Sequence, residues 1–452
     1  MPRAYRVRAC ALRRLLMAGG MVFLLSGPDI QMSRAAENAF TVITELDGRF
    51  SASDRLMAES DAAMAATIDV LSDMFGPVTE TPGTRQPTRV TLYRRSSSYQ
   101  SAIRRVGAGA FEENLAFTDY GRRESHVALQ PPCRREVIRG AGLPLLTKRQ
   151  IAHEVAHLWC DRRWPRDYRA APRWLREGLA TWASEAAMRK LGAVEAAEDD
   201  PFLASRMVMA QRVGDRLGAI APPSRANDPF AADDRRTSYA LDWAWCRWRL
   251  DAARPGTNAS LRNVSMDELI AFLCRDAAVS MGQFATYVRS FRPAWDQVAR
   301  SLERRGDAWL QFAFPGVDAI AWRRRGPAHS VYRIGGALRF LSEDDPGAKL
   351  LFARDADGYL AVVFERGRGL AIRRFNERLG EWAELARSDE PIGSRCDFEA
   401  HISRDRVRLV VAGRTRCEAR VSDLRISGPW GVSVEAGGAV EWRRLGVVAD
   451  GE

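Results

Sequence analysis

The pattern of hydrophobic and polar positions divides the chain into three stretches. The first, residues 40–132, alternates short β-like runs with one amphipathic helix, which indicates a small sheet. Its predicted elements are strands at 40–46, 89–93 and 125–130 and a helix at 54–75 that ends at Gly76 and Pro77. The second stretch, residues 147 to about 314, is mostly helical in period, with breaks at 164–172, 221–229 and 254–263.

After Pro315 the pattern changes to short apolar runs separated by Gly, Asp and Pro, which is typical of an all-β region. The predicted strands lie at 337–341, 349–353, 359–365, 370–375, 397–402, 407–412 and 440–445. We therefore predict an α+β protein. Residues 37–315 form a domain with a small N-terminal sheet and a helical C-terminal half, 316–328 form a linker, and 329–452 form an all-β sandwich domain.

The N-terminus has the shape of an export signal. Residues 1–14 contain five arginines and no acidic residue, and an apolar stretch of eleven residues follows at 15–25. That stretch is shorter than the roughly 20 residues needed to span a bilayer. Small residues at Ser33 and Ala35 predict cleavage after Ala35, so 1–35 is a signal peptide and the mature protein is periplasmic or secreted. An uncleaved signal would leave it tethered to the membrane, and both secretory and twin-arginine export remain open.

The positive charge does not indicate a nucleic-acid partner. The chain has 68 Lys+Arg and 57 Asp+Glu, a net charge of +11, and cleavage after Ala35 removes six arginines and Asp29, which leaves +6. Arginines are spread along the whole chain, whereas a phosphate-binding surface needs them clustered on one face.

Cleavage would also leave six of the seven cysteines. An even number of cysteines in an exported protein favours disulfides, and pairing of consecutive cysteines keeps each bridge inside one structural segment. We expect Cys133–Cys160, Cys246–Cys274 and Cys396–Cys417. Buried free thiols are the alternative.

The strongest motif is HExxH at 153–157, in a segment with a helical period. His153 and His157 are four residues apart, so both imidazoles lie on one helix face and can reach one Zn²⁺ ion at roughly 2.0–2.1 Å. Glu154 points beside them and is placed to take a proton from the attacking water. Asp161, eight residues beyond His153, lies roughly 12 Å along the helix and cannot share the ion.

A second motif, Glu177-x-x-Ala180, lies twenty residues after His157 in a segment that begins at Pro172. HExxH followed by a helix with Glu-x-x-Ala resembles the gluzincin metallopeptidases, the thermolysin-like and aminopeptidase-like group. The resemblance implies that Glu177 is the third zinc ligand. Ala180 lies on the same helix face, where its small side chain permits close helix packing, and Gly178 also indicates close contact.

The same resemblance implies two further features. The strand at 125–130 would form the rim of the substrate cleft, where its backbone could pair with an extended peptide. Tyr239 would stabilise the oxyanion of the reaction intermediate. His126 and Asn114 lie near this strand, but loop polarity explains them equally well and neither is assigned a role.

The sequence therefore predicts an exported zinc-dependent metallopeptidase that acts on a peptide or protein substrate, with Glu154 as general base and Zn²⁺ as cofactor. The tail at 428–442 weakly resembles the closing strands of concanavalin-like jelly rolls, so the β-domain could bind a glycan or an envelope component. One alternative is a non-catalytic zinc protein of the cell envelope that uses the β-sandwich as a binding module. Another is a zinc hydrolase that acts on a non-peptide amide.

Overall fold

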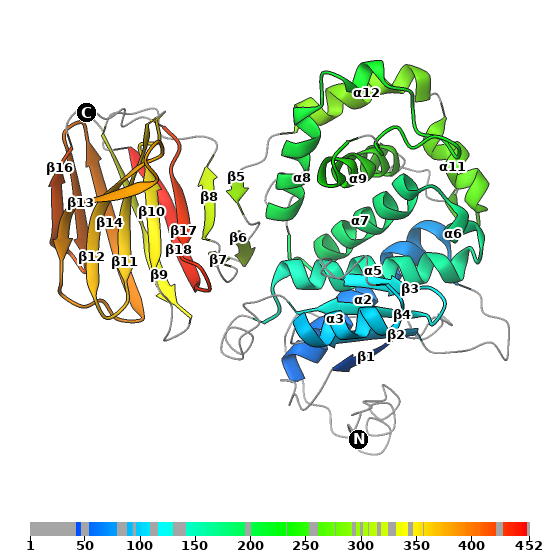
Figure 1. The fold of residues 1–452 in the computed structure, drawn as a ribbon, viewed down its shortest axis with the longest axis horizontal. Coiled ribbons are helices and arrows are strands. Elements are labelled where there is room, and N and C mark those ends of the chain that lie inside the picture. The colour runs from blue at the N-terminus through cyan, green and yellow to red at the C-terminus, as the bar shows by residue number, and fades with distance from the viewer. Residues whose placement is uncertain are drawn as a thin grey trace, which may run out of the picture. The chain divides into compact units, whose positions relative to one another are not determined.

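The chain forms two compact units (Figure 1). The first unit comprises Met1–Gln130, Leu146–Leu191 and Ala219–Phe284, and the second comprises Pro131–Leu145, Gly192–Gly218 and Ala285–Glu452. The computed structural model describes residues 42–46, 54–78, 88–93, 96–108, 116–129, 142–194, 200–231, 233–252, 261–275, 277–291, 295–298, 302–305, 307–313, 318–323, 331–341, 347–355, 357–421 and 428–449.

The first unit contains a sheet of four strands in the order β1-β2-β4-β3. Its strands are β1 (Val42–Leu46), β2 (Thr88–Tyr93), β3 (Ala116–Asp119) and β4 (Glu124–Ala128). β1, β2 and β4 are parallel, and β3 runs antiparallel to β4. The predicted sheet is therefore present, with one strand more than the sequence indicated.

The additional strand corrects the predicted cleft rim. β4 pairs with β2 on one side and with β3 on the other, so its backbone groups are already engaged. β3 is the edge strand on this side of the described sheet, and β1 is the other edge. Four residues are too few for a two-residue hydrophobic alternation to be recognised, which is why the sequence pattern missed β3.

The helices of the first unit follow the predicted periodicity. The helix predicted at 54–75 is confirmed as α2, and it ends at Gly76, whose φ of 83° suits a glycine. The α-helices assigned to this unit in whole or large part are α2 (Asp54–Phe75), α3 (Ser96–Arg105), α5 (Leu145–Arg163), α6 (Asp167–Ala170), α7 (Arg173–Lys190), α9 (Arg235–Ala252) and α11 (Met266–Cys274); α12 (Ala277–Ser290) is divided between the units.

Aromatic side chains hold α2, α5 and α7 together. Phe75 at the end of α2 lies 6.4 Å from the ring of Trp159 on α5 and 6.4 Å from Trp182 on α7. Both tryptophans are fully buried. Burying a side chain of this size removes roughly 200 Å² from water, or about 5 kcal/mol before conformational entropy is subtracted. This packing fixes the relative position of α5 and α7.

α9 also packs against α7, and Gly178 makes this contact possible. A Cβ atom at Gly178 would lie 2.6 Å from the Cys246 sulfur and would also collide with the Asp242 carbonyl, both on α9. The sequence predicted a close helix contact at Gly178, and the structure shows that its partner is α9.

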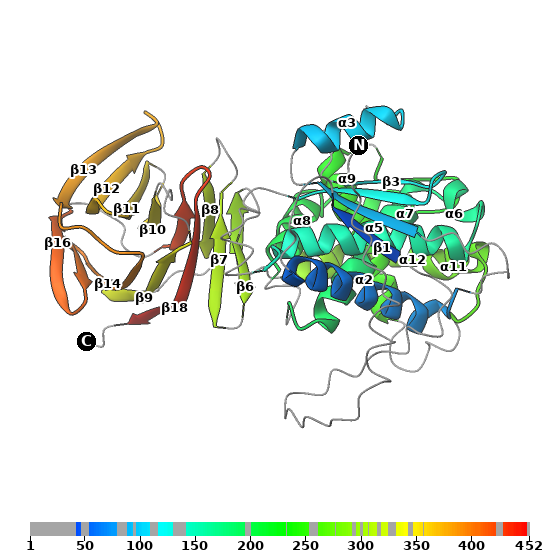
Figure 2. The same ribbon diagram turned by 90° about the horizontal axis from the view of Figure 1, so that it is seen from below.

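The second unit contains α8 (Pro201–Arg212) and two sheets of seven antiparallel strands. The sheets lie in two layers (Figure 2). The first is ordered β13 (Glu381–Ser388), β12 (Gly369–Asn376), β11 (Gly358–Glu365), β10 (Ala348–Phe352), β17 (Gly431–Val434), β8 (Ala319–Arg323), β5 (Trp295–Val298). The second is ordered β16 (Arg414–Arg420), β15 (Arg406–Val411), β14 (Arg395–Ser403), β9 (Tyr332–Phe340), β18 (Ala439–Ala449), β7 (Ala308–Phe312), β6 (Leu302–Arg305).

Alternating residues of the two sheets form the sandwich core. Val362, Phe364 and Phe398 belong to one buried cluster together with Trp442. Phe364 and Phe398, from different sheets, have ring centroids 4.9 Å apart. The predicted all-β sandwich is confirmed by this two-layer arrangement.

The predicted domain boundary is wrong. β5, β6 and β7 lie within residues 295–312, which the sequence assigned to the helical stretch, and all three pair within the sandwich sheets. β8 occupies Ala319–Arg323 inside the predicted linker and pairs with β17 and β5. These strands have only four or five residues each. Such short segments carry too little periodicity to reveal their long-range partners.

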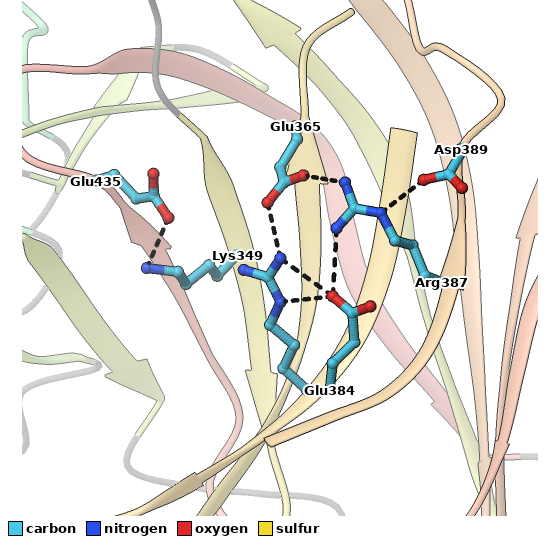
Figure 3. Close-up of polar contacts among 7 residues, drawn as sticks. Lys349, Glu365, Glu384, Arg387, Asp389 and Glu435 are labelled. Carbon is cyan, nitrogen blue, oxygen red and sulfur yellow. Dashed lines mark hydrogen bonds and ion pairs between the residues drawn. The ribbon is translucent and has the colours of Figure 1, made fainter. Parts of the chain in front are cut away.

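The outer face of the first sheet, opposite the core, carries charged side chains on neighbouring strands (Figure 3). Arg373 on β12 contacts Glu365 at 2.9 Å and Glu384 at 3.3 Å. Arg387 contacts the same two carboxylates at 3.0 and 3.2 Å, and Asp389 at 2.6 Å. We refer to these five residues as the outer-face network.

The predicted disulfides are not formed by the described cysteines. Cys160, Cys246, Cys274, Cys396 and Cys417 are free thiols, and Cys133 lies outside the described residues. Cys396 on β14 and Cys417 on β16 are separated by β15. Two strand spacings of about 4.8 Å exceed the Cα separation that a disulfide can bridge. The Cys246 sulfur instead faces Gly178 on α7.

The predicted signal peptide, residues 1–35, lies outside the described residues. Among the described residues, no helix has the length and apolar character required for a membrane crossing.

Candidate metal centre

Three side chains from α5 and α7 converge in the first unit. His153 and His157 lie one turn apart on α5, and their Nε2 atoms are 3.1 Å apart. Glu177 on α7 places Oε2 3.4 Å from the Nε2 of His153 and Oε1 3.7 Å from the Nε2 of His157. The structure therefore brings together the three residues that the sequence proposed as ligands.

The spacing of these atoms fits a tetrahedral metal ion. Zn²⁺ binds nitrogen and oxygen at roughly 2.0–2.2 Å, so two ligands of a tetrahedral site are separated by about 3.4 Å. The two Nε2 atoms are 3.1 Å apart, Oε2 of Glu177 lies 3.4 Å from one of them and Oε1 lies 3.7 Å from the other, and these distances bracket this value. In the described part of the chain, His153, His157 and Glu177 form the one group of this kind that could hold a metal.

A hydrogen bond to Tyr168 orients the ring of His157. The Tyr168 hydroxyl on α6 lies 2.7 Å from His157 Nδ1 and donates to the carbonyl of Arg176 at 3.3 Å. Because its proton is used on that carbonyl, the hydroxyl accepts from His157 Nδ1–H. The Nε2 lone pair of His157 is then free for a metal, which is the usual arrangement behind a ligating histidine.

Thr181 makes the equivalent contact with His153. Its Oγ1 lies 3.3 Å from His153 Nδ1. Thr181 follows Glu177 by four residues on α7, so one helix face supplies both a ligand and the residue that supports another ligand. Both histidines thus have a partner at Nδ1 and direct Nε2 toward the same point.

The charges of the three residues reinforce one another. Burial alone would raise the pKa of Glu177, but the nearby His157 and His153 lower it well below the usual range of a glutamate. Burial alone would lower the pKa of His157, but the Glu177 carboxylate and Glu154 raise it. The centre is therefore a small, partly buried site in which Glu177 supplies negative charge for a cation.

Glu154 lies beside the three converging residues and is not one of them. Its side chain is buried, and its Oε2 accepts a hydrogen bond from Thr118 Oγ1 on β3. The Thr118 hydroxyl is also 2.8 Å from Ser125 Oγ on β4. Glu154 thus faces the edge strand of the sheet, next to the two histidines on the same helix.

Tyr120, immediately after β3, closes one side of the centre. Its ring meets His157 edge-on at 6.2 Å and Tyr168 edge-on at 6.2 Å. Burial and the Glu177 charge raise the pKa of the Tyr120 phenol, so it stays protonated at neutral pH and can donate a hydrogen bond. The guanidinium of Arg169 lies 5.6 Å from the centre of the Tyr120 ring.

Tyr239, proposed from the sequence as an oxyanion donor, lies near the start of α9. Its ring is flanked by the guanidinium groups of Arg173 at 5.4 Å and Arg235 at 5.8 Å. Burial raises its pKa, with a further contribution from the charge of Glu177 on the adjacent α7. The catalytic role of Tyr239 stays a prediction.

Two residues considered from the sequence have other partners. Asp161 forms a two-pronged contact with Arg169, at 2.6 and 2.8 Å, in agreement with its exclusion as a ligand. His126 on β4 places Nδ1 2.8 Å from the Tyr93 hydroxyl. Because neighbouring residues in a strand point to opposite faces, His126 faces away from Ser125 and the centre. It again receives no role.

Sequence reasoning missed four residues that support the centre: Tyr168, Thr181, Thr118 and Tyr120. Only Thr181 carried a usable signal, because its helical spacing from Glu177 places both on one face. The other three come from a four-residue helix and a short strand with the turn after it, whose positions depend on chain folding.

No protein-family model matches this sequence, and a search of curated proteins found no match. Among solved structures, a carbohydrate-binding module, CBM66, from Bacillus subtilis is 14% identical over 34% of this chain and 96% of its own, with a TM-score of 0.31. The VIP36 exoplasmic/lumenal domain in a Ca²⁺/Man3GlcNAc-bound form is 12% identical over 35% of this chain and 85% of its own, with a TM-score of 0.30. A Bacillus subtilis protein of unknown function with a galectin-like fold is 12% identical over 36% of this chain and 91% of its own, with a TM-score of 0.28. At these TM-scores the similarity supports no statement about what this chain binds.

Proposed function

We propose that this protein is an exported zinc-dependent peptidase whose metal ligands are His153, His157 and Glu177. The observation that carries the proposal is the convergence of the three side chains: the two Nε2 atoms are 3.1 Å apart, and each lies 3.4 or 3.7 Å from one oxygen of Glu177. Glu154 lies beside them. A site with three protein ligands leaves a fourth position open, as catalytic zinc sites do. The resemblance of HExxH and Glu-x-x-Ala to the gluzincin pattern supports the same assignment.

A zinc ion bound at this point supplies Lewis acidity, which acidifies water and polarises a substrate carbonyl. Glu154 takes the proton of the attacking water and returns it to the leaving amine, as a general base and then a general acid. The phenol of Tyr239 donates a hydrogen bond to the developing oxyanion. Tyr168 and Thr181 hold the two imidazoles in the orientation that the reaction needs.

An extended peptide is the substrate shape that the sheet favours. β3 lies at the edge of the described sheet and carries Thr118, which touches Glu154. A peptide that pairs with β3 by strand addition would run past the base and the proposed ligands. This assignment replaces the one made for residues 125–130, because β4 is paired on both sides.

The test measures zinc content and peptide hydrolysis for the parent protein and for Glu154→Gln. We expect both proteins to retain about one zinc per chain, while the variant loses roughly 10²–10⁴-fold in rate, because only the proton-transfer group is altered. Glu124→Gln on β4 is the matched control, since this carboxylate pairs with Arg89 instead of facing the centre. Equal cleavage by the parent and Glu154→Gln would overturn the proposed role.

The same experiment separates the alternatives. A protein that holds zinc but cleaves no member of a diverse peptide library would favour the non-catalytic envelope protein. Hydrolysis of cell-wall amides without hydrolysis of peptides would favour the non-peptide zinc hydrolase, because the ligand chemistry is common to both reactions.

We further propose that the β-sandwich acts as a glycan-binding module. Three aromatic residues form a row across the outer face of β11, β12 and β13: Tyr359 is opposite Phe375, and Phe375 is opposite Trp382. Successive ring centroids lie 5.1 and 5.0 Å apart. Trp382 is 38% exposed, which is high for a tryptophan, and Lys349 Nζ lies 5.4 Å from the centre of its ring. An exposed indole beside charged hydrogen-bonding groups can stack on the apolar face of a sugar.

This second proposal is tested by electrophoresis of the full protein through gels that contain soluble polysaccharides. We expect at least one polysaccharide to retard the parent protein and Trp382→Ala to lose most of that retardation. Leu379→Ala, at a 67% exposed apolar residue between β12 and β13, is the matched control and should behave as the parent does. Unchanged retardation of Trp382→Ala would contradict the proposal.

A further inference from the structure

The carboxylate of Glu154 is held by a residue of the edge strand. Thr118 Oγ1 donates a hydrogen bond to Glu154 Oε2, and Thr118 Oγ1 lies 2.8 Å from Ser125 Oγ. Thr118 and Ser125 are directly opposite each other in the β3–β4 pairing. The three polar groups therefore form a hydrogen-bonded series that runs from β4 through β3 to α5.

The chemistry of these groups determines which atom donates and which accepts in each hydrogen bond of the series. A glutamate that acts as a base is ionised, and an ionised carboxylate only accepts hydrogen bonds. Thr118 has one hydroxyl proton, which it must donate to Glu154. Its oxygen therefore accepts from Ser125, whose hydroxyl donates. Each of the two hydroxyl protons therefore has one defined acceptor.

Burial gives this arrangement its strength. Glu154, Thr118 and Ser125 are 6%, 7% and 0% exposed. Hydrogen bonds to charged groups are stronger in such surroundings, and loss of the donor would leave the buried Oε2 without this partner. The contact therefore restrains the rotation of the Glu154 side chain.

The contact also divides the two oxygens of Glu154 between two tasks. Oε2 is engaged by Thr118, so Oε1 is the oxygen left to handle the proton of the reaction. A carboxylate anchored at one oxygen keeps the other in a defined position, which is how positioning lowers a reaction barrier.

We propose that Thr118 is the positioning residue for Glu154 and that it couples the edge strand β3 to the base. This inference rests on the proposed peptidase function for its catalytic consequence. A peptide would also pair with β3. The same strand would therefore receive the substrate and carry the residue that orients the base. Thr118 touches Glu154 and acts through it.

The kinetic test compares Thr118→Val with Thr118→Ser in the full, zinc-loaded protein. Valine has nearly the shape of threonine but lacks the hydroxyl, so we expect kcat to fall roughly 10–100-fold with KM changed less than about threefold and zinc still near one per chain. Serine restores the hydroxyl and should recover most of the lost rate. Thr67→Val on α2 is the matched control, because Thr67 is a fully buried threonine whose hydroxyl bonds only its own helix, at Ala63.

A second measurement does not depend on activity. The melting temperatures of metal-free parent, Thr118→Val, Glu154→Ala and the double variant form a thermodynamic cycle. If Thr118 holds Glu154, the loss in the double variant is smaller than the sum of the single losses by roughly 3 °C or more.

The outcomes separate this inference from the proposed function. A parent kcat in Thr118→Val, or an equal loss in the valine and serine variants, would overturn the positioning role. Additive melting temperatures would show that the two residues do not interact. If the parent cleaves no peptide, the proposed function fails, while the cycle still decides whether Thr118 holds Glu154.

Discussion

The two units of this protein place charged side chains in contrasting ways. In the first unit, the side chains of His153, His157 and Glu177 are 18%, 6% and 17% exposed, and their ligand atoms point at one position. In the second unit, the outer-face network joins Arg373 and Arg387 to three carboxylates on the surface of the sheet (Figure 3). Each of these arginines has several partners.

The difference shows which polar groups indicate chemistry. The partly buried polar groups on α5 and α7 lose hydration, so they need hydrogen-bond partners within the protein. Tyr168 and Thr181 are such partners, and they leave the Nε2 atoms of both histidines directed at one point. In the outer-face network, Glu384 and Asp389 are 41% and 83% exposed and retain water. The two arginines share Glu365 and Glu384, so one contact can substitute for another and the loss of one changes the free energy of unfolding little. The number of ion pairs is therefore a poor guide to function, and convergence is a better one.

The largest effect that would sharpen this comparison is expected from Glu177→Ala. Removal of one of three ligands should reduce zinc from about one to well under 0.2 per chain after dialysis, and the rate of peptide hydrolysis by roughly 10³-fold or more. Metal analysis with parallel kinetics checks this. Glu384→Ala in the outer-face network is the control and should keep both values. Zinc retained at parental affinity by Glu177→Ala would show that another residue completes the site.

An intermediate effect is expected from Tyr168→Phe. The variant keeps the ring but removes the acceptor for His157 Nδ1–H, so zinc affinity should fall roughly 10–100-fold while one zinc still binds at saturation. Competition with a chelator of known affinity measures the change. The same substitution in the sandwich core, Tyr332→Phe, should leave zinc affinity as it is, because Tyr332 belongs to the other unit. Equal affinities in both variants would mean that Tyr168 does not orient His157.

The smallest effect is expected from Arg387→Gln. This guanidinium contacts Glu365, Glu384 and Asp389 on the outer face of the sheet. Arg373 still contacts Glu365 and Glu384 in the variant, and water replaces the contact with the exposed Asp389. The melting temperature should change by no more than about 2 °C, and less at 0.5 M salt than at low salt. Differential scanning calorimetry checks this. A drop of about 5 °C or more would show that the network stabilises the sandwich substantially.

Local features of the sequence were sufficient for the elements that carry long, regular patterns. The helix at 54–75 was predicted with its bounds, and each of the seven strands predicted after residue 330 corresponds to a strand of the sandwich. The spacing of His153 and His157 also placed two imidazoles on one helix face. These predictions succeed because helical and β periodicities are properties of neighbouring residues.

Features that depend on pairing between distant segments could not be obtained in this way. The edge position of β3, the inclusion of β5–β8 in the sandwich and the separation of Cys396 from Cys417 by β15 all follow from strand order. Strand order is set by contacts between residues far apart in the chain, and short strands leave almost no local trace of it. The sequence therefore misplaced the cleft rim, the domain boundary and the disulfides.

The sequence by itself determined the residue types and helical spacing of the centre: two histidines and a glutamate on one helix, and a second glutamate on another. Only the tertiary structure decided that Glu177 faces both imidazoles and that Tyr168, Thr181 and Thr118 surround them. The physical reason is that spacing along a helix fixes direction within that helix alone. Convergence of side chains requires α5, α6, α7 and β3 to pack together. Phe75 on α2 contributes to this packing because its ring contacts Trp159 on α5 and Trp182 on α7.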